Sequence, residues 1–274
     1  MNSDDLILYH HRSSVCAAKV RVALAEKNLT FQSRLLRLDG DQFDESYLAL
    51  NPGAVVPTLV HRGHSIIESN VILEYLEDSF PSRPLRPADS FPCSQARLLM
   101  QRLDGGDGIH HAISVVTYAM ASRHPLIATA GGTDRTALAD VIKATMNARS
   151  QAWLEDVIVR GIDAPAFSLA VRQLDDLLAD FELRLGGGDW IVGDTHCIAD
   201  VAYTPYMIRL DLLQMDGLWS SRPAVADWYA RLRARPSSRA VLDWYDPKTI
   251  NSLTTGGRRA ATAIAAILTT GCAA

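Results

Sequence analysis

One stretch of the chain, residues 51–80, groups side chains that are suited to holding a small peptide. Val56 precedes Pro57 just before a strand-like run, and a proline after a β-branched residue at the start of a strand predicts a cis peptide bond. We expect the backbone N–H and C=O of Val56 to stay free for an extended ligand. Glu68 and Ser69 lie where a helix begins, so they offer a carboxylate, a hydroxyl and free N–H groups. These groups predict a site for a peptide that has an ammonium and a carboxylate at one end.

The elements that must position these residues alternate between strand and helix. Hydrophobic periodicity predicts strands at residues 6–9, 30–36, 58–60 and 65–67, and helices at 17–27, at 44–50 and after Glu68. Such alternation indicates strands in one sheet that is covered by helices. We therefore expect an α/β domain over residues 1–80.

The rest of the chain has a different pattern. Four prolines between residues 81 and 92 exclude a helix there, so we expect an interdomain linker at 81–93. The strand signal then fades, and residues 94–274 predict an all-helical domain with a C-terminal tail. Helical periodicity covers residues 94–103, 109–120, 136–160, 168–185, 198–213 and 224–235. The Ala-rich tail from residue 260 predicts either a docking helix or a frayed end.

Composition excludes several classes of protein. The 274 residues are 48% hydrophobic and 21% charged, as in an ordinary globular protein, and a net charge of −4 without a basic block argues against a nucleic-acid partner. The sequence contains no uninterrupted run of about 18 apolar residues, so it predicts no membrane span. The first residues lack the pattern of a signal peptide. The four cysteines have no C-x-x-C spacing, which indicates a reducing, cytoplasmic setting. The adjacent pairs His10-His11 and His110-His111 point apart, so we expect no metal site.

The order of the parts resembles the cytosolic glutathione transferase family, and so do the local motifs. LYHHRSSVCAAKVRVALAEKNL resembles the first strand, active-site loop and first helix of its serine-type members. ALNPGAVVPTLV is similar to their cis-proline segment, IIESNVILEYLEDSFP to their glutathione-binding turn, and DWIVGDTHCIADVAYTPY to a buried turn and helix of their second domain. The resemblance implies a thioredoxin-like N-terminal domain, an all-helical C-terminal domain, bound glutathione and a homodimer.

The resemblance also implies a catalytic residue. A free thiol is mostly protonated at neutral pH, and a hydroxyl that donates to sulfur beside a helix N-terminus favours the thiolate. Ser14 precedes Lys19 by five residues, as the catalytic serine of the family does, and Ser13 is the neighbour that can replace it. The alternative is that Ser14 only caps the first helix. Cys16 is two places from the position where omega-type relatives have a reactive cysteine, so we expect a structural, half-buried residue there.

The glutathione-binding residues follow from the same resemblance. Glu68 and Ser69 would bind the γ-glutamyl ammonium and carboxylate, the Val56 backbone would pair with the cysteinyl unit, and Pro57 would fix that geometry. Gln42 matches the position that approaches the glycyl carboxylate. The alternatives are a plain helix start for Glu68 and Ser69, and a solvated surface side chain for Gln42.

The second substrate would be a small hydrophobic electrophile. In relatives it lies against the active-site loop and the helices of the second domain, which implies roles for His11, Arg12, His111, Tyr118, Arg149 and Trp153. Simple exposure is the alternative for the loop residues. The core is the alternative for the aromatic residues, because an aromatic side chain at helical spacing is more often buried packing.

The sequence departs from the family in two places. Val55 stands where relatives often have Gln, so a side-chain contact to glutathione is lost. Cys197 stands where relatives have the Ser or Thr that caps a helix three residues before the aspartate, here Asp200. A thiol is a poor cap, so we expect Thr195 or Asp194 to substitute and the helix to be less stable.

These features predict a detoxification enzyme that transfers glutathione to an electrophilic, partly aromatic molecule. Residues 131–167 loosely resemble the extended helical region of bacterial β-etherases, which cleave β-aryl ethers with glutathione. A zeta-like isomerase is an alternative, supported by the RSSVC loop, although the extended region does not fit the short zeta second domain. A non-catalytic protein that binds glutathione or another ligand is the remaining alternative.

Overall fold

The computed structural model describes residues 5–105 and 108–270, which form two compact units interleaved along the chain. Unit 1 comprises residues up to 101 together with 187–207 and 227–245. Unit 2 comprises residues 102–186 and 208–226 and the chain from 246 onward. The units therefore do not follow a single cut in the sequence, and the boundaries expected at residues 80 and 93 stay a prediction.

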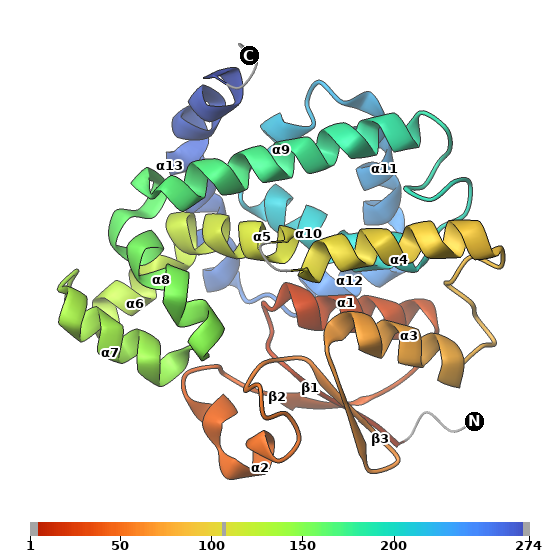
Figure 1. The fold of residues 1–274 in the computed structure, drawn as a ribbon, viewed down its shortest axis with the longest axis horizontal. Coiled ribbons are helices and arrows are strands. Elements are labelled where there is room, and N and C mark those ends of the chain that lie inside the picture. The colour runs from red at the N-terminus through yellow and green to blue at the C-terminus, as the bar shows by residue number, and fades with distance from the viewer. Residues whose placement is uncertain (1–4, 106–107, 271–274) are drawn as a thin grey trace. The chain divides into compact units, whose positions relative to one another are not determined.

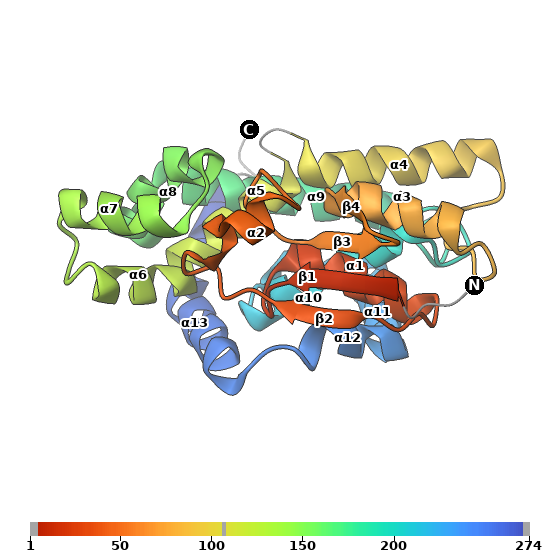
Figure 2. The ribbon, with the colours of Figure 1, turned by 90° about the horizontal axis from the view of Figure 1, so that it is seen from below.

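Unit 1 contains one mixed sheet of four strands. They are β1 (Leu6–His10), β2 (Gln32–Leu35), β3 (Thr58–His61) and β4 (His64–Ile67). The strand order is β2-β1-β3-β4, with β1 parallel to β2 and antiparallel to β3, and with β3 antiparallel to β4. Figure 2 shows this order, with β1 in the middle of the sheet. All four predicted strands are confirmed, with ends that differ by at most two residues.

Helices cover the sheet of unit 1. They are α1 (Val15–Glu26), α2 (Glu45–Leu48), α3 (Ser69–Ser79) and α12 (Arg239–Leu242). Both α3 and α12 pack against α1, and Figure 1 shows α1 and α3 on the same side of the sheet. Leu24 on α1 and Ile72 and Leu76 on α3 are fully buried there. This burial supports the predicted α/β arrangement, because it removes the apolar face of each helix from water.

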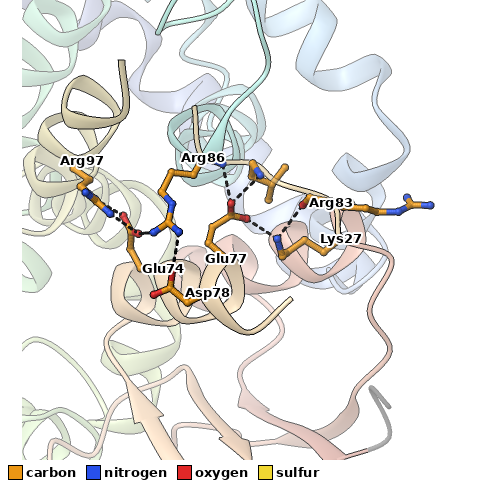
Figure 3. Close-up of polar contacts among 8 residues, drawn as sticks. Lys27, Glu74, Glu77, Asp78, Arg83, Arg86 and Arg97 are labelled. Carbon is orange, nitrogen blue, oxygen red and sulfur yellow. Dashed lines mark hydrogen bonds and ion pairs between the residues drawn. The ribbon is translucent and has the colours of Figure 1, made fainter. Parts of the chain in front are cut away.

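A buried ion pair holds the proline-rich segment against α1 and α3 within unit 1. Lys27 Nζ lies 2.6 Å from Glu77 Oε1, and the two side chains are only 1% and 3% exposed. Figure 3 shows that Lys27 also donates to the Arg83 carbonyl, while Glu77 accepts from the N–H groups of Leu85 and Arg86. Each buried charge is therefore paired and hydrogen-bonded, as a dry environment requires.

The prediction that no helix enters the proline-rich segment, residues 81–92, is wrong for the last residues of that segment. Helix α4 (Ser90–Asp104) begins before Pro92, which is its third residue. The first N–H groups of a helix have no partner inside the helix, so a proline in the first turn removes no hydrogen bond.

Unit 2 is helical in the part that the structure describes. Its elements include α5 (Ile109–Thr117), a π-helix at Tyr118–Ser122, α6 (Arg123–Thr129), α7 (Arg135–Thr145), α8 (Ala148–Arg160) and α9 (Pro165–Leu185). The single helical segment expected at 136–160 is wrong, because Asn147 caps a new helix there by accepting from the Ser150 N–H. Leu138, Ile142, Leu154 and Ile158 form the core between α7 and α8.

The Ala-rich tail is part of a long helix, α13 (Pro247–Thr270). Gly256 and Gly257 are buried where α13 approaches the backbone at Met120 and at Leu213, and a Cβ atom at either glycine would meet a carbonyl oxygen. The docking-helix expectation is thus confirmed up to residue 270, and residues 271–274 lie outside the described residues. Within the described ranges, no helix combines the length and apolarity needed to cross a membrane.

Two further helices begin near the expected positions, α10 (Ile198–Leu212) and α11 (Pro223–Ala234). Asp200 is the third residue of α10, and its buried carboxylate accepts from the N–H groups of Cys197 and Ile191 and from the Trp228 indole. The Cys197 sulfur itself lies against the N–H groups of Ala199 and Asp200 in the first turn of α10. No contact of this kind is recorded for Thr195 or Asp194 among the described residues, so neither takes over the cap. Burial raises the pKa of the Asp200 carboxyl, and the three donors to its carboxylate offset that effect.

Candidate functional site

Ser14 lies at the junction between the loop after β1 and the N-terminus of α1. Its Oγ accepts a hydrogen bond from the Ala17 N–H at 3.2 Å, so the expected alternative of an N-cap is confirmed. Accepting uses an oxygen lone pair and leaves the O–H proton available. No acceptor for that proton is recorded in the described part of the chain. The cap fixes the oxygen at the positive end of α1, where the hydroxyl can donate to an anion.

Ser13 is in a different situation. Its N–H and its Oγ both lie 3.3 Å from Nδ1 of His11. Because Nδ1 accepts from the Ser13 N–H, it carries no proton, and the Ser13 hydroxyl can only donate to it. The Ser13 proton is therefore already engaged, which favours Ser14 over Ser13 as a donor to a ligand.

A buried arginine that sequence reasoning missed holds the loop before Ser14. The Arg21 side chain on α1 donates to the backbone carbonyls of His11 at 3.3 Å and Arg12 at 3.1 Å, and to the Ala240 carbonyl at 2.9 Å. The His11 carbonyl also accepts from the Ser14 N–H. Burial lowers the pKa of Arg21 to about 10, so the group remains charged at neutral pH.

Arg21 also determines the state of a buried histidine at the end of β1. It donates to Nδ1 of His10 at 3.1 Å, and a guanidinium can only donate, so Nδ1 is unprotonated. The proton is therefore on Nε2, which donates to Ser33 Oγ at 2.8 Å. Burial, with the nearby Arg21 charge as the second cause, lowers the pKa of His10 to about 3. The His10 ring also contacts the edge of Trp244, centroid to centroid at 4.6 Å.

Arg12 and His11 differ in exposure although both lie on this loop. Arg12 is exposed, and its guanidinium carbon lies 5.9 Å from the centroid of the Trp244 ring. His11 is half-buried and is engaged with Ser13. A cation stacked on an indole keeps a defined position at modest energetic gain, so Arg12 is oriented as well as exposed.

A second buried cation connects α1 to the start of α3. Lys19 donates to Asn70 Oδ1 at 2.9 Å, and Asn70 donates onward to the Met100 carbonyl at 2.7 Å. Lys19 also lies 5.7 Å from the centroid of the Tyr206 ring, and the Tyr206 hydroxyl is 3.8 Å from Cys16 Sγ. In the sequence, Lys19 served only to identify Ser14, which precedes it by five residues. Lys19 is fully buried on α1, so its ammonium group contacts neighbouring side chains and does not face solvent.

Glu68 and Ser69 occupy the turn that opens α3. Glu68 is exposed and adopts φ 66° and ψ 115°, a conformation that costs a non-glycine residue about 1–3 kcal/mol. No side-chain cap hydrogen bond is recorded for Glu68. Ser69 is buried as the first residue of α3. A strained glutamate that caps nothing does not fit a plain helix start, which is the alternative for this turn.

Val56 and Pro57 precede β3, and the bond between them is cis, as expected from the sequence. Among the described residues, no hydrogen bond is recorded for the Val56 N–H or C=O. Gln42 is only 2% exposed and accepts from the Gly40 N–H at 3.1 Å, so the alternative of a solvated side chain is wrong. These residues, Ser14, Glu68 and Ser69 all belong to unit 1.

Three of the expected second-substrate residues form an aromatic cluster in unit 2. The Trp153 ring on α8 lies edge-on to His111 on α5 at 5.0 Å and to Tyr118 at 6.0 Å. Tyr118 also donates to Met146 Sδ at 3.6 Å, and burial raises the pKa of its hydroxyl. All three residues are half-buried, and Tyr118 and Trp153 pack against the core between α7 and α8, which supports the alternative of core packing for those two. The Arg149 side chain lies outside the described residues.

No group of three His, Cys, Asp or Glu side chains in the described ranges is placed to hold an ion.

Two family models match the chain. The model described as "Glutathione S-transferase, N-terminal domain" matches residues 4–78, and the model described as "Glutathione S-transferase, C-terminal domain" matches residues 151–231. Together the two models cover more than half of the 274 residues.

Individual proteins are also similar to the chain. The chain is 40% identical to maleylacetoacetate isomerase of Dictyostelium discoideum over 104 residues, 37% of this chain and 48% of that protein. It is 24% identical to tetrachloro-p-hydroquinone reductive dehalogenase of Sphingobium chlorophenolicum over 251 residues, 88% and 98% of the two chains. The chain spans about half the length of the isomerase and of other relatives that are about one-third identical to it.

Among solved structures, the fold is similar to β-etherase LigF from Sphingobium sp. strain SYK-6. The TM-score is 0.73 at 23% identity, and the likeness covers 88% of this chain and all of that chain. At this identity the likeness shows the fold alone.

The state of His10 predicts a pH dependence of stability. Its folded pKa of about 3 lies below the ordinary value of 6.5, so between these values the unfolded state binds a proton that the folded state does not. The stabilisation is full above pH 6.5 and is lost as the pH falls toward 3, at up to about 1.4 kcal/mol per pH unit. His10→Gln keeps a donor and an acceptor but cannot titrate, so urea unfolding between pH 4 and pH 6 should show a shallower slope.

Ser33→Ala is the control for this measurement, because it removes the hydroxyl partner and keeps the imidazole. It should lower the free energy of unfolding while retaining the wild-type slope. Burial also lowers the pKa of His196, to about 4, so some slope should remain in every variant. An unchanged slope in His10→Gln would show that His10 does not stay neutral in the folded state.

Proposed function

Because the chain belongs to the glutathione S-transferase family, we propose that it binds glutathione in unit 1 and uses the glutathione thiolate to attack an electrophilic, partly aromatic small molecule. The observation that carries this proposal is the Ser14 hydroxyl, which caps α1 through its oxygen and keeps its proton for a ligand. The proposed setting is the cytoplasm.

The Ser14 proton is directed at the cysteinyl sulfur of glutathione. A hydrogen bond to sulfur stabilises the thiolate more than the thiol, and the positive end of α1 acts in the same sense. The thiol proton leaves to solvent, the sulfur forms a bond to carbon, and the leaving group departs with the electron pair of the bond that breaks. Arg21 contributes by holding the His11 and Arg12 carbonyls, which fixes the loop that carries Ser14.

The rest of the tripeptide is assigned to groups at the start of α3, before Pro57 and in the segment before α2. Glu68 binds the γ-glutamyl ammonium, and Ser69 with the first N–H groups of α3 binds the γ-glutamyl carboxylate. The Val56 backbone pairs with the cysteinyl unit beside Pro57. Gln42, buried beside Gly40, approaches the glycyl carboxylate.

The second substrate is proposed to be aromatic. His111, Tyr118 and Trp153 in unit 2 offer ring faces and edges, and Arg149 is assigned to the same role from the sequence. His11 and Arg12 in unit 1 are assigned to second-substrate binding from the sequence alone. Cleavage of a β-aryl ether, with an aryl oxide as leaving group, is the proposed form of the reaction.

A glutathione-dependent isomerase is the second candidate, because a relative of that name is 40% identical over 104 residues. Turnover on a panel of a β-aryl ether, chlorodinitrobenzene and a cis-dienone acid separates the candidates. Glutathione binding without turnover on any of them would favour a carrier protein.

Ser14→Ala tests the catalytic assignment. It removes the hydrogen bond to sulfur, so kcat/KM should fall by about 10²-fold and the pKa of bound glutathione, read from thiolate absorbance, should rise. Ser14→Thr should retain most activity. Asn147→Ala, which removes the cap of α8, is the matched control for a lost cap: it should cost about 1 kcal/mol of stability without this kinetic loss. Ser13→Ala should also stay active, and the reverse result would move the role to Ser13.

Glu68 predicts a separation of stability from binding. Glycine adopts a positive φ without strain, whereas Glu68→Ala keeps the strained backbone. The free energy of unfolding should therefore be about 1 kcal/mol higher for Glu68→Gly than for Glu68→Ala. Both variants lose the carboxylate and should bind glutathione about tenfold more weakly, measured by calorimetry. Glu68→Gln should lose less. Wild-type affinity in the glycine variant would remove Glu68 from the site.

We propose a homodimer that buries the exposed apolar side chains of α3 and α4. Val71 on α3 is 55% exposed and Leu98 on α4 is 57% exposed, and the two side chains belong to neighbouring helices of unit 1 that are joined by the Glu74–Arg97 ion pair. Val71→Asp with Leu98→Asp should give a monomer in light scattering. Leu169→Asp on α9, where the wild-type side chain is 67% exposed, is the matched control and should remain dimeric. Dissociation by the control alone would place the interface on α9.

A further inference from the structure

The segment just before Pro57 is held by a buried network of polar side chains. We propose that Tyr47, Asn51 and Thr58 are positioning residues that fix the direction of the Val56 N–H for pairing with glutathione. This inference rests on the proposed function and names what builds the backbone part of that binding site.

The network converges on one carbonyl. The Tyr47 hydroxyl on α2 donates to the Val55 carbonyl at 2.5 Å, and Asn51 Nδ2 donates to the same oxygen at 2.9 Å. Thr58 Oγ1 at the start of β3 lies 3.0 Å from the Tyr47 hydroxyl and 3.1 Å from Asn51 Nδ2. The three side chains are 4%, 1% and 0% exposed. Asn51 Oδ1 is also used, because it accepts from the Gly53 N–H at 3.0 Å.

The protons of this network can be assigned from its geometry. Tyr47 has one proton, which goes to the Val55 carbonyl at the shortest distance, so the Tyr47 oxygen accepts from the Thr58 hydroxyl. Thr58 in turn accepts from one Asn51 N–H, and the other Asn51 N–H goes to Val55. The ring is closed, both lone pairs of the Val55 carbonyl are filled, and burial raises the pKa of Tyr47, which keeps its hydroxyl protonated. A buried network with every group satisfied is rigid.

The network determines where the Val56 N–H points. The Val55 carbonyl and the Val56 N–H belong to one planar trans peptide unit, so they point in opposite directions. The carbonyl points into the buried network, and the N–H therefore points away from it. No protein acceptor for that N–H is recorded in the described ranges, and the residue as a whole is half-buried.

The side chain at position 55 makes this backbone contact more important. Valine offers no polar group to a peptide ligand, so the 55–57 segment can hold glutathione only through its main chain. A main-chain donor is effective only if its direction is set before the ligand arrives, since otherwise binding must bear the cost of ordering it. Tyr47 and Asn51 set that direction from the buried side.

Tyr47→Phe is the test, and Tyr203→Phe is its matched control. Tyr203 is also fully buried in unit 1, and its hydroxyl also donates to a backbone carbonyl, that of Leu99, at 2.9 Å. Both variants should lower the melting temperature to a similar extent, because each loses one buried hydrogen bond. Only Tyr47→Phe should raise the Kd and KM for glutathione, by about fivefold, with kcat at saturating glutathione within about twofold of wild type.

Thr58→Val and the double variant extend the test. Thr58→Val breaks the same ring, so combining it with Tyr47→Phe should raise the Kd by less than the product of the two single effects. Thr58→Ser should restore affinity. The NMR order parameter of the Val56 N–H, measured without glutathione, should fall in Tyr47→Phe and stay unchanged in Tyr203→Phe.

The outcomes separate this inference from the proposed function. If wild-type protein binds glutathione and Tyr47→Phe binds it as tightly as Tyr203→Phe does, the positioning role is wrong while the proposed function stands. If wild-type protein releases no heat with millimolar glutathione, the proposed function fails, and with it the ligand assigned to the Val56 N–H. An unchanged order parameter of the Val56 N–H in Tyr47→Phe would overturn the structural basis of the inference in either case.

Discussion

Burying a guanidinium group requires a partner for its N–H donors, and Arg21 finds its partners in the loop that leads into α1. The loop is thereby fixed from its inner side, and Ser14 inherits a defined position at its end. The segment before Pro57 follows the same rule, since Tyr47 and Asn51 saturate the Val55 carbonyl from within. In both loops the inward groups are fully paired and the outward groups are left for a ligand.

Much of unit 1 could be predicted from the sequence, because local signals determine it. The alternation of apolar runs gave all four strands, and the Val56-Pro57 pair indicated the cis bond that the structure contains. The turn at Glu68 was located from the helix start that follows it. Each of these signals depends on neighbours within a few residues, and the family resemblance then supplied roles that such local signals do not contain.

The remaining features depend on contacts between distant segments. Lys19 and Arg21 look like solvated charges on a helix, and only the packing of α3 and α12 against α1 buries them. The alternative of a solvated side chain for Gln42 was wrong because its burial and its contact with the Gly40 N–H are tertiary features. The break before α8 was missed because helical periodicity continues through Asn147. Its capping role is seen only in the structure, where its side-chain oxygen accepts from the Ser150 N–H. Pattern reasoning is weakest where tertiary packing overrides local preference.

The ion pair between Lys27 and Glu77 has a consequence for how this chain can diverge. Loss of either charge alone leaves the other buried without a counter-ion, at a cost of about 3–5 kcal/mol, whereas two well-packed apolar side chains can replace the pair with little penalty. A substitution at Lys27 or Glu77 should therefore be tolerated only when the other residue changes as well. Two sites 50 positions apart are expected to evolve as a single unit, and this covariation should be visible across descendants of the same ancestor.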